Sequence, residues 1–362
     1  MKNIVCFHLF NDFSGSPQVL RTVVEGLLDK GYSIDLITSR GGVLDELKGC
    51  DNLKYRQYSY SFARNGIIRL MRYLWVQLLT FCMALGYICK KNTVIYINTI
   101  LPIGAAIGGR LAGKRVVYHY HENAKAKSTA YRILAKIMQI IASDIICVSQ
   151  YQRSFLRRKR RVYVVPNALQ KGLAARLYPD SDKAFENRCV LMLGSLKGYK
   201  GTLEFIALAA RMNKYSFELV INDSQENIDR YLKEKGITPT ANLTIYPRQD
   251  DVAPFYNRAS LVLNLSNREQ FIETFGLTAL EAMTAGLPVI VPTVGGIAEM
   301  VEDGRNSYRI DVQEKEKIEK KIEEILTDKE LYLYLSKNAL ECSKNYTADK
   351  MTGCIEHLIL EQ

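Results

Sequence analysis

The stretch LVLNLSNREQFIETFGLTALEAMTAGLPVIVP (261–292) decides the fold. It opens with the apolar run LVLNLS (261–266), passes through a polar loop, and continues as a predicted helix over 277–285 that Gly286 closes. The apolar run LPVIVP (287–292) follows at once. A strand, a helix and a second strand in this order predict a parallel βαβ unit, with the helix beginning at the carboxyl end of the sheet.

The turn Thr274-Phe275-Gly276 therefore predicts an anion site. The first N–H groups of a helix have no partner within it, and the helix dipole is positive at that end. Gly276 would let a phosphate approach the backbone closely. Glu273 and Glu281 flank the turn, and two carboxylates beside a phosphate suit neutral hydroxyls, as on a sugar and a ribose. The alternative is that Glu273 only complements the helix dipole and that Glu281 is a surface charge.

The same alternation of short apolar strands and helix-length segments runs through the chain, which predicts the α/β class with doubly wound sheets. A chain of 362 residues is too long for one ordinary core. Strand-like runs fill the first half, and the pattern restarts after a polar stretch at 167–187, which is the predicted linker. We therefore expect two domains, 1–168 and 169–344, with the final helix (345–362) packing on the first. The predicted strands are 3–8, 33–38, 93–98, 114–120, 144–149, 162–166, 189–195, 218–222, 242–246, 261–266 and 287–292.

The two halves carry charge of opposite sign. Residues 1–170 hold 25 Lys and Arg against 9 Asp and Glu, whereas the rest of the chain holds 24 against 29. A basic half suits nucleic acid, an anionic membrane or phosphorylated substrates. No zinc spacing, RNA-binding aromatic motif or basic zipper accompanies the charge, so we expect no nucleic-acid partner.

The segment GIIRLMRYLWVQLLTFCMALGYICKK (66–91) also allows a membrane interpretation. From Tyr73 to Cys89 its only strongly polar residue is Gln77, and a run of that length is at the short end of a spanning helix. A core helix or an interfacial helix is favoured over a span, because a span would interrupt the β/α alternation. The basic run RRKRR (157–161) is either a solvated surface or a site for anionic lipid headgroups.

Compartment and metal content follow from what the sequence lacks. The 8 cysteines show no paired spacing and mostly sit in apolar stretches, so we expect buried, reduced thiols. The N-terminus has no signal-peptide pattern, which favours the cytoplasm. Asp180-Ser181-Asp182 resembles a metal-binding DxD motif but lies in the predicted linker, where a solvated turn is the better interpretation. No metal and no cofactor are expected.

Several motifs together resemble one known family. ETFGLTALE (273–281), with its Glu-x7-Glu spacing, followed by EAM and later by GG-x2-E, looks like the signature of the family-four, or group-one, retaining glycosyltransferases. Further matches fall in the family's order at VVYHYHEN (116–123), SDIICVSQYQ (143–152), VVPNAL (164–169) and LGSLKGYKG (193–201). The resemblance extends over nearly the whole chain. It implies the GT-B fold, in which two Rossmann-like domains face each other across a cleft that holds the active site.

The resemblance also implies roles in the second half. Glu273 would be the catalytic carboxylate that contacts donor sugar hydroxyls, and Glu281 would hold the donor ribose. Lys200 would neutralise the diphosphate. The diphosphate would also be bound at the turn formed by Thr274, Phe275, Gly276 and Leu277.

One position departs from the family pattern. Ser195 stands where the family has the second diphosphate-binding cation, an arginine. Lys197 or Arg248 would have to supply that charge. Arg248 and Val252 also fall where the family lodges the nucleotide base.

In the first half, the family's glycine-rich loop is represented by Ser14-Gly15-Ser16-Pro17, with Gly15 as its single glycine. His121 matches the family histidine near the sugar and the acceptor, and His119 is the competing choice. Because alternate residues of a strand face the same side, spacing cannot separate the two.

The resemblance thus implies a retaining, metal-independent hexosyltransferase that uses a nucleotide diphosphate sugar as co-substrate. The basic, apolar first half indicates a glycan or lipid-linked acceptor in cell-surface polysaccharide or lipopolysaccharide synthesis. The protein would then lie peripherally on the cytoplasmic face of the inner membrane. The alternatives are another GT-B enzyme, such as a nucleotide-sugar epimerase, and a catalytically silent GT-B partner subunit.

Overall fold

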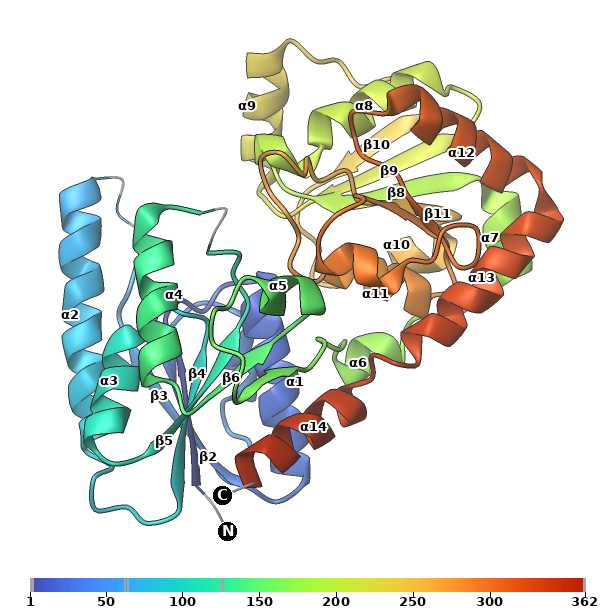
Figure 1. Cartoon of the computed structure of the whole chain (residues 1–362). Coiled ribbons are helices and arrows are strands. Elements are labelled where there is room, and N and C mark those ends of the chain that lie inside the picture. Colours follow the sequence, from blue (N-terminus) through green and yellow to red (C-terminus); the bar gives the residue numbers. More distant parts are fainter. Residues whose placement is uncertain (1–2, 62, 64, 125–126, 361–362) are drawn as a thin grey trace. The chain divides into compact units, whose positions relative to one another are not determined.

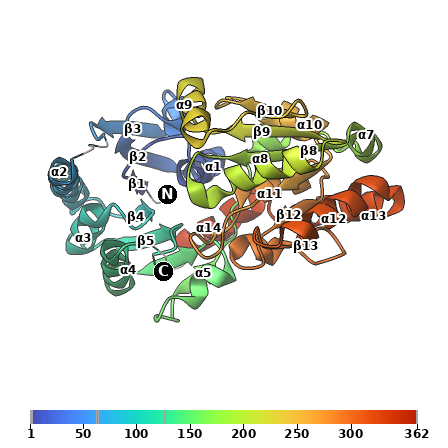
Figure 2. The same ribbon diagram turned by 90° about the horizontal axis from the view of Figure 1, so that it is seen from above.

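The computed structural model describes residues 3–61, 63, 65–124 and 127–360. The chain forms two compact units, unit 1 from Met1–Gln170 with Ala348–Gln362 and unit 2 from Lys171–Thr347. Each unit contains one parallel sheet with helices packed on it (Figures 1 and 2). The predicted α/β class with doubly wound sheets is confirmed.

The sheet of unit 1 has 7 strands in the order β3-β2-β1-β4-β5-β6-β7, and every neighbouring pair is parallel. Successive strands run outward from β1 in one direction and from β4 in the other. The carboxyl ends of β1 and β4 are therefore a topological switch point, where ligands of such sheets bind. The strands are β1 (Asn3–His8), β2 (Ser33–Ser39), β3 (Leu53–Tyr58), β4 (Thr93–Asn98), β5 (Arg115–Tyr120), β6 (Asp144–Cys147) and β7 (Val162–Val164).

Helices cover both faces of this sheet. α2 (Gly66–Leu85), α3 (Ile103–Leu111) and α4 (Thr129–Ile141) lie on one face, and α1 (Gly15–Asp29) and α14 (Ala348–Leu360) on the other (Figures 1 and 2). The 3-10 helix η1 (Val43–Leu47) packs on α1, and the short helix α5 (Gln150–Ser154) joins β6 to β7. The core between the sheet and the α2–α4 layer is built from strand residues such as Phe7, Ile95 and Tyr118.

Helix α2 is not the core helix that its composition also allowed. Only 22% of its most apolar 18-residue window is buried. Its inner face packs closely on α3, where a Cβ on Gly104 would come within 2.0 Å of the Gln77 carbonyl oxygen and one on Gly108 within 2.4 Å of that of Phe81. The core interpretation is wrong because most of the large apolar side chains between Ile67 and Leu78 are exposed to solvent, although Val76 is buried.

Helix α14 returns the end of the chain to unit 1. Tyr32 donates a hydrogen bond to Glu356 Oε1 at 2.9 Å, and Lys30 forms an ion pair with the same carboxylate. Residues 361–362 of the predicted final helix lie outside the described residues.

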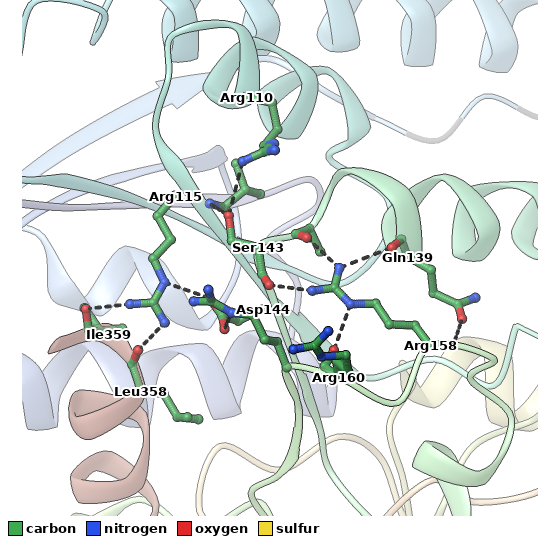
Figure 3. A network of polar contacts seen from close by, with 12 residues as sticks. Arg110, Arg115, Gln139, Ser143, Asp144, Arg158, Arg160, Leu358 and Ile359 are labelled. Carbon is green, nitrogen blue, oxygen red and sulfur yellow. Dashed lines mark hydrogen bonds and ion pairs between the residues drawn. The ribbon is translucent and has the colours of Figure 1, made fainter. Parts of the chain in front are cut away.

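A polar network ties α14, α4 and β6 together (Figure 3). Asp144 is fully buried and forms ion pairs with Arg115 at 2.7 Å and Arg161 at 2.8 Å. The Arg115 guanidinium also donates to the carbonyl oxygen of Leu358 at 2.6 Å in α14. Arg158 donates to the carbonyl groups that end α4, at Gln139, Ala142 and Ser143. Helix carbonyls at this end have no partner within the helix, so this arginine acts as a side-chain cap.

Two residues of the basic run 157–161 therefore have a structural role. Arg158 and Arg161 bind within the network, whereas Arg157, Lys159 and Arg160 have exposed side chains.

The sheet of unit 2 has 6 parallel strands in the order β10-β9-β8-β11-β12-β13, with its switch point between β8 and β11. Ile318, Ile322, Ile325 and Leu326, on one face of α12 (Lys315–Thr327), are buried. The strands are β8 (Cys189–Gly194), β9 (Ser216–Ile221), β10 (Leu243–Tyr246), β11 (Leu261–Leu263), β12 (Val289–Val291) and β13 (Tyr308–Arg309). The helices are α6 (Lys171–Ala174), α7 (Ser181–Asn187), η2 (Gly198–Lys200), α8 (Thr202–Arg211), α9 (Gln225–Lys235), α10 (Ala253–Arg258), α11 (Leu277–Thr284), η3 (Gly296–Met300), α12 (Lys315–Thr327) and α13 (Lys329–Ser343).

Three sequence expectations need correction. Strands β3 and β13 were not expected, because LKYRQY (53–58) is polar and β13 has only two residues. The predicted linker at 167–187 contains α6 and α7, both of which belong to unit 2. All 8 cysteines are free, as expected, but only Cys6, Cys147 and Cys189 are buried.

The Asp144 network predicts a large effect on the stability of unit 1. In Asp144→Ala, the partly buried guanidinium of Arg115 loses its fully buried counter-ion, which should lower the free energy of unfolding by about 3 kcal/mol. Urea unfolding followed by fluorescence of Trp75, the single tryptophan, reports on unit 1. Glu25→Ala is the control, because its ion pair with Arg21 is partly exposed and should contribute under about 1 kcal/mol. Equal effects of the two substitutions would contradict the role given to Asp144.

Candidate active site

The turn before α11 has the geometry expected of an anion site. Gly276 has φ +101° and ψ +68°, and a Cβ there would come within 2.4 Å of Ile297 Cγ1, so no other residue fits. The chain then enters α11 directly at Leu277. Among the described residues, no acceptor is found for the main-chain N–H groups of 275–278, and Gly276 and Leu277 are partly exposed. These donors stand at the carboxyl end of β11, beside the switch point of the sheet.

Glu273 is positioned by its own backbone. The N–H of Gly296 donates to its carbonyl oxygen at 2.8 Å. A Cβ on Gly295 would come within 2.5 Å of the same oxygen, so residue 295 must be glycine, with φ +120°. The Glu273 side chain then accepts a hydrogen bond from Ser266 Oγ at 3.1 Å and forms an ion pair with Lys200.

Lys200 arrives on a separate loop that packs against the Glu273 loop. The N–H of Asn267 donates to the Tyr199 carbonyl at 2.8 Å, and the Tyr199 and Phe271 rings stack with centroids 4.7 Å apart. The Lys200 ammonium lies over the Phe271 ring, 4.6 Å from its centroid. A cation and a carboxylate are thus held side by side near the amino end of α11.

Glu281 is buried rather than a surface charge, so that alternative is wrong. Its side chain is 7% exposed and accepts a hydrogen bond from the Tyr256 hydroxyl at 2.5 Å. Burial raises the pKa of Glu281, and the Tyr256 hydrogen bond opposes this.

The remaining predicted donor-binding residues of unit 2 differ in their surroundings. Ser195 follows β8, and its Oγ is buried with no hydrogen-bond partner in the described part of the chain. Lys197 and Arg248 have exposed side chains, so both alternatives for the second cation stay open. Val252 is partly exposed and precedes α10.

In unit 1, a chain of hydrogen bonds crosses the switch point between β1 and β4. His8 Nε2 donates to the Phe10 carbonyl at 2.8 Å, so its Nδ1 is the acceptor for Asn98 Nδ2 at 3.0 Å. Asn98 Nδ2 also donates to the Ser16 carbonyl at 3.1 Å, which orients the amide. Asn98 Oδ1 therefore faces His121 and accepts from its Nε2 at 2.8 Å. This tautomer leaves Nδ1 of His121 as the acceptor nitrogen of the ring.

The structure separates the two histidines that spacing could not. His119 is fully buried within β5, and its Nδ1 meets the Tyr96 hydroxyl at 2.7 Å. His121 lies just beyond the end of β5 and is partly exposed, so of the two it is the one a ligand can reach. The rings are 4.1 Å apart. Burial lowers the pKa of His121, and the neighbouring His119 and His8 lower it further.

Gly15 begins α1 at the carboxyl end of β1 and is exposed. Glu122, next to His121, is a structural residue, because its carboxylate accepts from the Ile100 N–H at 3.2 Å. Across the described part of the chain, no group of three or more metal-binding side chains is found.

Sequence reasoning missed several residues of these clusters. Asn98 and His8 end predicted strands, so the rule that carboxyl strand ends meet at a switch point could have found them. Tyr256 and Ser266 gave no sequence signal, because each reaches its carboxylate only through the folded loops.

Two family models match the chain. Glycosyltransferase Family 4 matches residues 13–170, and Glycosyl transferases group 1 matches residues 179–341. The chain belongs to the group-one, family-four glycosyltransferases. An uncharacterized glycosyltransferase of Haemophilus influenzae is 22% identical over 350 residues, with 93% of this chain and 94% of that protein covered. Another, from Methanocaldococcus jannaschii, is 27% identical over 256 residues, covering 68% of each chain.

Solved structures of GT-B glycosyltransferases share the fold. HepE of Anabaena, in complex with UDP and glucose, matches with a TM-score of 0.80 at 18% identity and 99% coverage of both chains. WaaG, a glycosyltransferase involved in lipopolysaccharide biosynthesis, matches with a TM-score of 0.71 at 17% identity, covering 99% of this chain and 100% of that one. The predicted GT-B fold is thereby confirmed, and the protein is a group-one glycosyltransferase of that fold.

The buried histidines predict that unit 1 loses stability as the pH falls. Burial lowers the pKa of His8 from 6.5 to about 4 and that of His119 to about 3, so between those values and 6.5 the unfolded chain binds more protons. The free energy of unfolding should fall by about 1 kcal/mol per pH unit for each histidine on acidification below 6.5. In His119→Gln this slope, measured by urea unfolding with Trp75 fluorescence at pH 7, 6 and 5, should be shallower. An unchanged slope would mean that His119 is not held neutral.

Proposed function

We propose that the protein is a retaining glycosyltransferase that moves a sugar from a nucleoside diphosphate sugar to a glycan or lipid-linked acceptor in cell-surface polysaccharide or lipopolysaccharide synthesis. The observation that carries this proposal is the Lys200–Glu273 ion pair beside the amino end of α11. It places a cation and a carboxylate beside the N–H groups of 275–278, for which the described residues supply no acceptor, at the carboxyl edge of the unit 2 sheet.

Each group has a distinct task in donor binding. The N–H groups near Gly276 and the Lys200 ammonium neutralise the diphosphate. Lys200 then exchanges its carboxylate partner for phosphate, which frees Glu273 to accept hydrogen bonds from sugar hydroxyls. Glu281, held by Tyr256, accepts from the ribose hydroxyls. The Lys200 ammonium and the partial positive charge at the amino end of α11 together make a metal ion unnecessary.

The transfer step needs positioning and electrostatic stabilisation rather than a protein nucleophile. The bond from the anomeric carbon to the diphosphate breaks, and the acceptor oxygen bonds to that carbon on the same face. The acceptor proton passes to the departing phosphate oxygen. Nδ1 of the neutral His121 accepts a hydrogen bond from a sugar hydroxyl, which a protonated imidazole could not do.

The relatives support the donor class and the acceptor class separately. HepE binds UDP-glucose in a solved structure, and WaaG is involved in lipopolysaccharide biosynthesis. Mannosylfructose-phosphate synthase of Agrobacterium fabrum is 29% identical over 199 residues, covering 49% of this chain and 42% of that protein. A uridine diphosphate sugar such as UDP-glucose is therefore the first donor to test.

Glu273→Gln tests the role of the carboxylate. The amide keeps the size but lacks the charge that orients the sugar hydroxyls, so turnover should fall by about 10²-fold. The assay measures UDP release from UDP-glucose, and proton NMR of the product should show the anomeric configuration of the donor retained. Glu269→Gln is the matched control, because Glu269 is exposed in the same loop and should leave turnover unchanged. Normal turnover by Glu273→Gln would contradict the proposed site. If the wild type releases no nucleoside diphosphate from any nucleotide sugar, the silent partner subunit would be favoured. Epimerised donor without transfer would favour the epimerase.

Lys200→Ala tests the diphosphate site. Removing the ammonium should weaken UDP binding and raise the donor KM by about tenfold or more, with a smaller loss of kcat. Isothermal titration with UDP, and separately with uridine, checks this, because uridine lacks the phosphates and should bind the variant and the wild type equally. Lys197→Ala and Arg248→Ala identify the second cation, since only the one that contacts the diphosphate should weaken UDP but not uridine binding. Equal UDP affinity for Lys200→Ala and the wild type would contradict this assignment.

A further inference from the structure

Helix α2 turns its apolar side toward solvent. Ile67, Met71, Leu74 and Leu78 recur at helical spacing along its outer face, and all are exposed. Trp75, beside this stripe, is 65% exposed. An amphipathic helix of a soluble domain normally buries such a stripe and exposes its polar side. Here the buried residues are Gln77, Thr80 and Ala84, which are polar or small, and one larger apolar residue, Val76.

The inner face of α2 is fixed to α3 and cannot be surrounded by lipid. Gln77 Oε1 accepts from the Gly104 N–H at 2.8 Å, and the Tyr73 hydroxyl donates to the Leu101 carbonyl at 2.9 Å. The close approach at Gly104 and Gly108 leaves no space between the two helices. α2 is long and apolar enough to cross a membrane, but in this arrangement only its outer face is available to one.

The other two helices of the layer add exposed residues of the same kinds. α3 exposes Ile107 and Leu111, and α4 exposes Ile133 and Ile140. We call the exposed side chains of α2, α3 and α4 the α2–α4 face. Its exposed cations, with those of the turn after α2, are Arg69, Arg72, Lys90, Lys91, Arg110, Arg132 and Lys136.

The charged residues of segment 52–170 are almost all positive. Residues 52–170 contain 20 Lys and Arg but only two acidic residues, Glu122 and Asp144. Both carboxylates are buried, and Asp144 is already paired with two arginines. The described surface of this segment therefore presents cations and exposed apolar side chains without an exposed carboxylate.

We propose that the α2–α4 face docks on an anionic bilayer, with α2 lying in the plane of the interface. Exposed apolar side chains enter the boundary between headgroups and acyl chains, while the surrounding lysines and arginines bind acidic headgroups. The same face of a second copy fits poorly, because pairing the two faces would bring like charges together. Nucleic acid would match the charge but would leave the apolar side chains in water.

Docking this way would bring one edge of unit 1 to the membrane. The most exposed part of α2 is its amino-terminal half, and the Tyr73–Leu101 hydrogen bond joins it to the segment after β4. The adjacent Ile100 N–H binds Glu122, next to His121. A lipid-linked acceptor could then reach His121 without leaving the bilayer. This last point rests on the proposed sugar transfer, whereas the docking does not.

The single tryptophan allows a test on the unmodified full chain. Vesicles of phosphatidylglycerol and phosphatidylcholine should shift Trp75 emission to the blue, and raising NaCl from 0.1 to 0.5 M should weaken binding several-fold. Lipids brominated near the headgroup should quench Trp75 more than lipids brominated near the chain ends. Because Trp75 lies midway along α2, stronger quenching by the deep bromines would mean that α2 spans the bilayer and would overturn the proposal.

Substitutions on the face provide the second arm. Leu74→Asp with Leu78→Asp should weaken vesicle binding by about tenfold or more, and Lys91→Glu with Lys136→Glu should abolish the preference for acidic lipid. Tyr334→Asp is the matched control, because Tyr334 is exposed to a similar extent in unit 2 and should leave binding unchanged. UDP release tests the sugar-transfer proposal independently of vesicle binding.

Three further results would overturn the docking proposal. One is wild-type Trp75 emission that does not respond to acidic vesicles at low salt. Another is binding of duplex RNA in preference to acidic vesicles, with unchanged Trp75 emission. The third is a lipid-free dimer in which Trp75 is already shielded and which Leu74→Asp dissociates.

Discussion

The candidate donor site depends on one backbone contact, between the Glu273 carbonyl and the Gly295–Gly296 turn. Neither the hydrogen bond nor the close approach at Gly295 leaves the loop freedom to shift. Because the Glu273 backbone is fixed, its side chain meets Lys200 and Ser266. The chain enters α11 at Leu277, and the N–H groups of 275–278 find no acceptor among the described residues. Charge and donors are therefore in place before a ligand arrives, which is the condition for electrostatic preorganisation.

The candidate site of unit 1 consists instead of neutral side chains joined by hydrogen bonds. Burial removes the charge from His8 and His119, and the Asn98 amide fixes which nitrogen of His121 carries the proton. A neutral imidazole with a defined acceptor nitrogen suits a sugar hydroxyl, whereas an imidazolium would compete with the lysine for phosphate. Unit 2 thus holds a cation and carboxylates at its sheet edge, whereas unit 1 holds neutral hydrogen-bonding groups.

Much of the fold could be predicted from the sequence, because parallel strands buried on both faces are apolar runs of recognisable length. Strands such as 3–8 and 93–98 were placed to the residue. Strand β3 was not predicted because an edge strand can be polar. Strand β13 was not predicted because two residues are too few to show a pattern. For the site, the motif around Glu273 was recognisable, but spacing could not show that Glu281 is buried against Tyr256. Nor could it separate His119 from His121, since only the end point of β5 decides that.

Helices α2 and α12 show why periodicity alone is insufficient to predict burial. Both have apolar residues at helical spacing, yet α12 buries Ile318 and Ile322 while α2 exposes Leu74 and Leu78. The difference lies in the opposite faces. The face of α12 opposite its apolar stripe carries charged side chains that require water, so the apolar stripe must face the core. The face of α2 opposite its apolar stripe carries no charged residue between residues 73 and 89. Its small and hydrogen-bonding groups fit against the glycines of α3, so this face packs inward and the apolar stripe stays outside. An exposed stripe of this size is costly in water, and its cost is removed only when another apolar phase covers it. With cations around it and no exposed carboxylate in the described segment, an anionic bilayer is the phase that satisfies both its apolar and its charged groups.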